Sequence, residues 1–278
     1  MKVMLARNYG MCFGVRRALD IALDAGKKNN GKRIYTYGPL VHNKDVVDLL
    51  ESRGIHSVDS IDDISDPDGA VLIIRAHGVP DSDYTRAEEK GMEVIDATCP
   101  FVAKAKTKAK ELEREGLNVV ILGQKDHPEV RGIAESLRSP VIIVSPDDIN
   151  RLDGDDYGLV SQTTQSGSTF DSIVEGFMSQ GKRVKAINTI CSATIKRQES
   201  AKETAGNADV MLVIGGMNSA NTGRLADICS GMTETKHIER AEDLKNEWFE
   251  GRDTVGITAG ASTPDWIVEG VINKLKEI

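Results

Sequence analysis

Three cysteines lie in similar local sequences and recur at a nearly regular interval. Cys12, Cys99 and Cys191 are about 90 residues apart. The last two each follow a strand-like stretch, in Glu-Val-Ile-Asp-Ala-Thr-Cys-Pro and Lys-Ala-Ile-Asn-Thr-Ile-Cys-Ser, whereas the first lies between Gly10 and Gly14. A single cysteine is more often a small buried apolar residue than a ligand. Three cysteines in repeated contexts favour a shared role as ligands of a metal centre.

Polar loops repeat at the same interval. One set lies about 30 residues after each cysteine, and a second set lies about 65–70 residues after each. The first set holds His42, His127 and Ser219, and the second holds His77, Thr163 and Ser262. Open parallel sheets bind ligands at the carboxyl ends of their strands. Each third of the chain would therefore contribute one thiol and two polar loops to one shared site. Periodic α/β chains also produce such spacings by coincidence, so spacing alone leaves both interpretations open.

Strand-like apolar stretches alternate with amphipathic helical stretches, which predicts an α/β fold with parallel-rich sheets. The period indicates three α/β domains, residues 14–97, 98–189 and 190–278, around a pseudo-threefold axis, with residues 1–13 contributing the strand and loop of the first cysteine. Helices are expected at residues 103–114, which are lysine-rich, and 264–278, which carry apolar side chains at core-facing spacing. The expected strands are residues 34–37, 70–75, 92–95, 119–122, 141–144, 157–160, 184–187, 210–214 and 254–257.

Composition and charge disfavour several classes of protein. The chain of 278 residues has a net charge of -8 and is only 4% aromatic, whereas a nucleic-acid binder usually has a basic face and stacking aromatic residues. No apolar run is long enough to span a membrane, and the N-terminus turns polar by Arg7, too early for a secretory signal. We therefore expect a cytoplasmic protein without nucleic-acid or membrane partners, in a compartment where thiols stay reduced.

Eight short motifs occur in order between Cys12 and Ser262. They are Gly-Met-Cys-Phe-Gly-Val, Gly-Pro-Leu-Val-His-Asn, Arg-Ala-His-Gly, Asp-Ala-Thr-Cys-Pro, His-Pro-Glu-Val, Gln-Thr-Thr, Thr-Ile-Cys-Ser-Ala-Thr and Thr-Ala-Gly-Ala-Ser. Each is weak alone, but the ordered set resembles the 4-hydroxy-3-methylbut-2-enyl diphosphate reductase family (LytB type) of the non-mevalonate isoprenoid pathway. The resemblance implies a trefoil of three α/β domains around a central cluster. It also implies two-electron reductive dehydroxylation of an allylic diphosphate to isopentenyl and dimethylallyl diphosphates.

The resemblance implies a 4Fe-4S cluster held by Cys12, Cys99 and Cys191. Three thiolates leave the fourth iron of such a cluster open to a substrate hydroxyl, whereas four would close the site. Cys229 is expected to be a core residue instead, because it shares a helix face with Leu225, Ile228 and Met232.

Substrate and proton-transfer roles also follow from the resemblance. Glu129 would be the acid, Thr163 would lie near the substrate hydroxyl, and Thr194 and His127 would complete the surrounding network. Glu129 also has a structural interpretation, since a carboxylate in the first turn of a helix favourably meets the helix dipole. Ser262 could likewise only cap a helix. The implied diphosphate contacts are His42, His77, His127, Ser219, Asn221 and Ser262.

One position departs from the family pattern, because the second serine usual in its Asn-Ser-Ser-Asn loop is Ala220 here. The family uses an external electron donor such as ferredoxin or flavodoxin. Three alternatives remain: another three-cysteine iron–sulfur enzyme such as one of quinolinate synthesis, a zinc hydrolase, and a non-catalytic binder of small anions. The zinc alternative is disfavoured because the chain lacks short-spaced ligands such as Cys-x-x-Cys.

Overall fold

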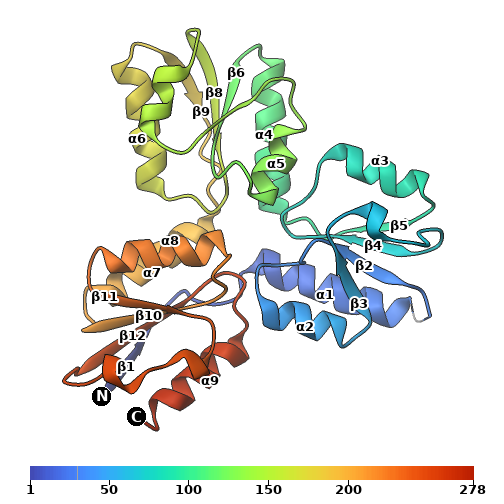
Figure 1. Ribbon diagram of the computed structural model, residues 1–278. Coiled ribbons are helices and arrows are strands. Elements are labelled where there is room, and N and C mark those ends of the chain that lie inside the picture. Colours follow the sequence, from blue (N-terminus) through green and yellow to red (C-terminus); the bar gives the residue numbers. More distant parts are fainter. Residues whose placement is uncertain (30) are drawn as a thin grey trace. The chain divides into compact units, whose positions relative to one another are not determined.

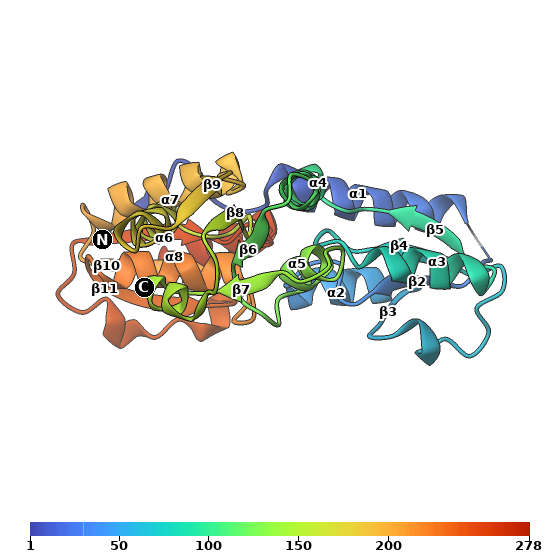
Figure 2. The same cartoon turned by 90° about the horizontal axis from the view of Figure 1, so that it is seen from above.

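The computed structural model describes residues 1–29 and 31–278, and these residues form three four-stranded sheets in which every pair of neighbouring strands is parallel. Helices lie on both faces of the sheets (Figures 1 and 2). The predicted α/β class with parallel sheets is therefore confirmed. The first sheet contains β2 (Ile34–Tyr37), β3 (Ile55–Val58), β4 (Val71–Ile74) and β5 (Glu93–Asp96); the second contains β6 (Asn118–Leu122), β7 (Val141–Ile143), β8 (Asp156–Ser161) and β9 (Arg183–Ala186).

The third sheet takes its strands from both ends of the chain. It contains β10 (Val210–Ile214), β11 (Glu234–Ile238), β12 (Thr254–Ala259) and, paired with β12, the N-terminal β1 (Lys2–Leu5). The helices are α1 (Phe13–Lys28), α2 (Lys44–Glu51), α3 (Asp81–Glu89), α4 (Pro100–Arg114), α5 (Pro128–Ala134), α6 (Gly167–Ser179), α7 (Ser192–Ala205), α8 (Ala220–Ser230) and α9 (Asp265–Leu275).

All three sheets have the same topology. Their strand orders are β3-β2-β4-β5, β7-β6-β8-β9 and β11-β10-β12-β1. In each, the chain enters at a central strand, moves outward to one edge and returns to the second central strand; in the first two sheets it then continues to the other edge. The fourth position of the third sheet is filled by β1, so the strand preceding Cys12 is equivalent to β5 before Cys99 and β9 before Cys191. The repeat expected from the cysteine spacing thus has a structural basis.

The strand order also explains why polar loops occur twice per repeat. Two adjacent central strands in each sheet send the chain to opposite sides, and such a switch point is where open α/β sheets bind ligands. His42, His127 and Ser219 follow the first of these strands, and His77, Thr163 and Ser262 follow the second.

Core packing shows why the central strands are apolar on both faces. In β10, Val210, Leu212 and Ile214 pack with α9, whereas Met211 and Val213 pack with α7 and α8. Each of these five side chains is 0% exposed. A parallel strand covered by helices on both faces has no solvent side, so its sequence is a continuous apolar run rather than an alternating one.

Two strands, β3 and β11, were not expected from the sequence. Both lie at sheet edges, and their sequences Ile-His-Ser-Val and Glu-Thr-Lys-His-Ile are largely polar. An edge strand is paired on one side only and tolerates polar side chains, which removes the apolar run used to identify strands. The expected helix at 264–278 begins one residue later, since Pro264 is its N-cap.

The chain divides into two compact units. One comprises Met1–Arg16, His42–Val46 and Ser192–Ile278, and the other comprises Arg17–Val41 and Val47–Cys191. They are called the terminal unit and the central unit below. The three-domain boundaries given above stay a prediction. Within residues 1–29 and 31–278, no helix combines the length and apolar character needed to cross a lipid bilayer.

Candidate functional site

Glu129 of the central unit is buried and held by one residue. It occupies the first turn of α5, whose N-cap is His127 and whose first residue is Pro128. The Thr163 backbone N–H donates to Glu129 Oε1 at 2.6 Å, and the Thr163 hydroxyl donates to Oε2 at 2.8 Å. Thr163 follows β8 and Glu129 follows β6, and these strands are neighbours in the sheet. The switch point of the second sheet therefore brings the predicted acid to the predicted hydroxyl contact.

Burial sets the protonation of this carboxyl. The side chain is 1% exposed, and desolvation raises the pKa of Glu129 to about 7, against the two Thr163 hydrogen bonds that lower it. A carboxyl of this pKa holds a proton in about half of the molecules at neutral pH. It can both give and regain a proton under cellular conditions, as a general acid must.

Two histidines lie near the start of α5, which carries Glu129. The Glu129 backbone N–H donates to His127 Nδ1 at 3.2 Å, which leaves Nε2 as the protonated nitrogen of a neutral ring. The ring of His77, from the loop after β4, meets the His127 ring edge-on, with centroids 5.3 Å apart. Loops from two different sheets of the central unit thus place both predicted histidines next to Glu129.

Backbone hydrogen bonds connect two of the cysteines to the same group. The Cys191 N–H donates to the Thr163 carbonyl at 3.0 Å, and the Cys99 N–H donates to the Ala76 carbonyl, next to His77, at 2.9 Å. Both thiols are half-buried, and Cys99 is the N-cap of α4. The central unit therefore joins six predicted site residues through a short series of contacts: Cys99, His77, His127, Glu129, Thr163 and Cys191.

The terminal unit contains the other predicted residues, and its loops are also tied to each other. The Cys12 N–H donates to the Ala261 carbonyl at 3.0 Å. The adjacent Ser262 hydroxyl donates to the His42 carbonyl at 3.1 Å. Ser262 therefore does not cap α9, where Pro264 is the N-cap without any side-chain hydrogen bond. The serine instead joins the loop beside Cys12 to the loop of His42.

Asn221 is the strongest candidate for ligand binding among the described residues of the terminal unit. It lies in the first turn of α8, is 5% exposed, and neither its amide nitrogen nor its amide oxygen has a hydrogen-bond partner among the described residues. Ser219 caps the same helix by accepting a bond from the Thr222 N–H. A buried amide without partners costs free energy unless a ligand satisfies it, and a helix N-terminus favours an anion. Thr194, on α7, is also buried at 4% exposure.

Sequence analysis missed Arg197, which is 5% exposed on α7. Its guanidinium donates to the Gly10 carbonyl at 2.8 Å and to the Ala193 carbonyl at 3.1 Å. Gly10 has a φ of 67°, a region that favours glycine, and it precedes Cys12 by two residues. Arg197 therefore fixes the loop that carries the first cysteine. Its position six residues after Cys191, in a helix otherwise rich in exposed charge, was the available signal.

The four cysteines differ in environment as the sequence predicted. Cys12, Cys99 and Cys191 are half-buried, form no disulfide, and lie in loops that precede helices, a donor set that fits a three-thiolate iron–sulfur cluster. Cys229 is 0% exposed and packs with Leu225 in the core between α7, α8 and β10, where burial raises the pKa of its thiol to about 11. Met232 does not share that face as expected. It lies beyond the end of α8 and is 51% exposed.

Parallel sheets that bring a buried acid, histidines and hydroxyls together at their switch points define an α/β enzyme. The family model described as LytB protein matches residues 3–276, so the chain belongs to the LytB family of oxidoreductases. The chain is 44% identical over 281 residues, covering 100% of it and 98% of the relative, to 4-hydroxy-3-methylbut-2-enyl diphosphate reductase of Geotalea uraniireducens (strain Rf4).

Two solved structures agree with this assignment. One is described as (E)-4-hydroxy-3-methyl-but-2-enyl diphosphate reductase, the terminal enzyme of the non-mevalonate pathway, with 42% identity, a TM-score of 0.73 and 100% coverage of both chains. The other is E-1-hydroxy-2-methyl-but-2-enyl-4-diphosphate reductase from Plasmodium falciparum, with 26% identity, a TM-score of 0.94, and coverage of 99% of this chain and 88% of that one.

Proposed function

We propose that the chain reduces 4-hydroxy-3-methylbut-2-enyl diphosphate to isopentenyl and dimethylallyl diphosphates. The observation that carries this proposal is the buried Glu129–Thr163 pair, whose carboxyl has a pKa of about 7 and which is tied through the Thr163 carbonyl to Cys191. An acid linked through Thr163 to a proposed cluster ligand suits a reaction that transfers protons and electrons together. The names of the relatives support this choice of substrate.

Cys12, Cys99 and Cys191 would hold a 4Fe-4S cluster. When bound, that cluster would pass electrons to the substrate one at a time and offer an iron that acts as a Lewis acid toward oxygen. An external donor such as ferredoxin or flavodoxin would deliver the electrons. Replacing the C–OH bond of the substrate by C–H takes two electrons and two protons and releases one water.

The chain's own groups bind the substrate and move the protons. Asn221 would satisfy its buried amide on the diphosphate, together with Ser219, Ser262 and the histidines. Thr163 would orient the substrate hydroxyl while its own hydroxyl contacts Glu129 Oε2 at 2.8 Å. Glu129 would then deliver a proton to the departing oxygen through this contact, because a protonated leaving group is water rather than hydroxide.

The test is chemical analysis and turnover of anaerobically purified protein. We expect a brown protein with iron and sulfide in equal amounts, which converts the substrate to both products with a chemical reductant. A colourless protein that carries zinc would overturn the proposal, as would an iron–sulfur protein that leaves this substrate unchanged.

A substitution tests the role of the acid. Glu129→Gln keeps the size of the side chain but cannot donate an acidic proton, so turnover should fall by about 10²–10⁴-fold with cluster content unchanged. Glu135→Gln is the matched control, because Glu135 is exposed at the end of the same helix. A Glu129→Gln variant that retained more than about a tenth of wild-type turnover would remove Glu129 from the reaction.

A further inference from the structure

A pocket of about 350 Å³ lies in the central unit on one side of Glu129. It is lined on α5 by Glu129, Gly132 and Ile133, which share a helix face because they are three and four residues apart. Thr163, which holds the carboxylate, does not line this pocket. The pocket is therefore not the space in which Thr163 would meet a substrate.

The pocket leads from buried to exposed side chains. Glu129 at its inner end is 1% exposed. Asp96, Ala103 and Thr107 also line it and are exposed. A volume of this size holds several water molecules, each of which needs only about 10–15 Å³ of such space. The pocket therefore extends from exposed side chains to the buried face of α5 that carries Glu129.

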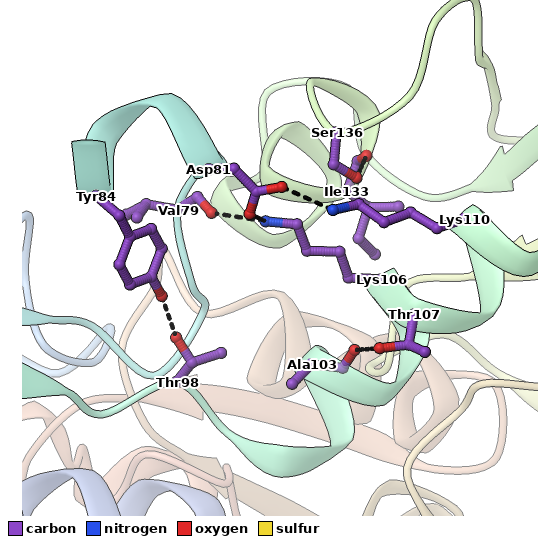
Figure 3. A network of polar contacts seen from close by, with 10 residues as sticks. All are labelled: Val79, Asp81, Tyr84, Thr98, Ala103, Lys106, Thr107, Lys110, Ile133 and Ser136. Atoms are coloured by element: carbon purple, nitrogen blue, oxygen red, sulfur yellow. Dashed lines mark hydrogen bonds and ion pairs between the residues drawn. The ribbon is translucent and has the colours of Figure 1, made fainter. Parts of the chain in front are cut away.

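Tyr84 and Thr98 bring two hydroxyl groups to the lining of the pocket. The Tyr84 and Thr98 hydroxyls lie 3.3 Å apart (Figure 3). Burial raises the pKa of Tyr84 to about 12, against the bond to Thr98 that lowers it, so its hydroxyl stays protonated. A protonated hydroxyl both donates and accepts, which is what a chain of water molecules needs from the wall that it follows.

Ion pairs join α3 to α4 beside the pocket. Asp81, at the start of α3, accepts bonds from Lys106 Nζ at 2.6 Å and Lys110 Nζ at 2.7 Å, both on α4 (Figure 3). Lys106 Nζ also donates to the Val79 carbonyl at 3.2 Å. Burial raises the pKa of Asp81, but the two ammonium groups lower it by more, so that it lies below its usual range and the carboxylate stays charged. The two helices are thus fixed at a set spacing.

We infer that this pocket is the route by which protons from solvent reach Glu129 between turnovers. The inference rests on the proposed function, in which Glu129 gives up a proton in each cycle and must regain one. The pocket approaches Glu129 from a side that Thr163 does not line, and His77 is the one proposed substrate contact among its lining residues, so the acid would be recharged from the side opposite to Thr163. Tyr84 and Thr98 are positioning residues for this water.

The experiment fills the pocket at two depths. Ala103→Phe places a ring at the exposed end, where the fold is not at risk, and Gly132→Val fills the inner end. A Cβ at Gly132 would lie 3.5 Å from the nearest atom, the Val79 carbonyl carbon, and the melting temperature of the variant shows whether the two further methyl groups of valine fit. Lys104→Phe is the matched control, because Lys104 is the exposed neighbour of Ala103 and does not line the pocket.

With a chemical reductant and saturating substrate, both filled variants should lower kcat by about tenfold or more. The solvent deuterium isotope effect on kcat should rise, since proton uptake becomes limiting, while KM, iron content and melting temperature stay at wild-type values. Lys104→Phe should match wild type in all of these.

Unchanged kcat in both filled variants would overturn the inference. So would a lower kcat with an unchanged isotope effect, because that pattern indicates a purely structural disturbance. Failure of the proposed function is distinguishable, since the wild-type protein itself would then not convert the substrate.

Discussion

Replacing Glu129 by glutamine should change the pH dependence of stability. In the wild-type protein the pKa of this carboxyl rises from 4.5 to about 7 on folding, because burial penalises the charge. A raised pKa means that the protonated form favours folding. The stabilisation is complete below pH 4.5 and is lost as the pH rises through 7.

The size of the effect follows from the two pKa values. Between pH 5 and pH 8, ionising a group with these values costs the folded protein about 2–3 kcal/mol relative to the unfolded chain. Glutamine does not titrate. Its amide can accept from the Thr163 N–H and donate to the Thr163 hydroxyl, as a protonated carboxyl does. The variant should therefore match wild type at pH 5 and be more stable at pH 8.

The assay is thermal melting of both proteins at equal iron content and scan rate, at several values between pH 5 and pH 8. A gain of this size corresponds to roughly 5–10 °C in melting temperature at pH 8. Glu135→Gln, at the exposed end of the same helix, should show no such trend. A constant difference between Glu129→Gln and wild type, or one that favours wild type as the pH rises, would refute the raised pKa and with it the acid role.

Three further predictions concern the cofactor and the substrate. Replacing any of the proposed ligands Cys12, Cys99 and Cys191 by serine should reduce iron content and abolish turnover. Cys229→Ser should keep its iron and lose only packing stability. Equal iron loss in all four variants would show that Cys229 is also a ligand. Asn221→Ala should raise KM by roughly 10–100-fold, as expected for lost bonds to a charged group, and an unchanged KM would place the diphosphate elsewhere. Arg197→Gln should lose iron to a chelator faster than wild type, because the Gly10 carbonyl loses its hydrogen-bond donor. The control is Lys196→Gln, at the exposed neighbouring position. Equal rates of iron loss in the two variants would contradict the prediction.

Sequence periodicity predicted the parallel α/β class and most strands, because central strands of covered parallel sheets are continuous apolar runs. It also separated Cys229 from the other cysteines through its apolar neighbours, and the structure buries Cys229 fully. The edge strands β3 and β11 escaped, since their polar sequences carry no such run. The periodicity of apolar residues reflects burial, and an edge strand that is partly exposed has too few buried positions to produce a recognisable apolar pattern.

Contacts between distant segments were decided by the tertiary structure alone. The sequence placed Glu129 in a first helical turn, where dipole capping and acid catalysis were equally consistent with its position. Only the pairing of β6 with β8 brings Thr163 to it, across 34 residues, and only burial raises its pKa to about 7. Ser262 likewise bonds to the His42 carbonyl across 220 residues rather than capping its own helix. Local sequence fixes which groups follow each strand, but strand order and desolvation determine which of them meet and which proton they hold.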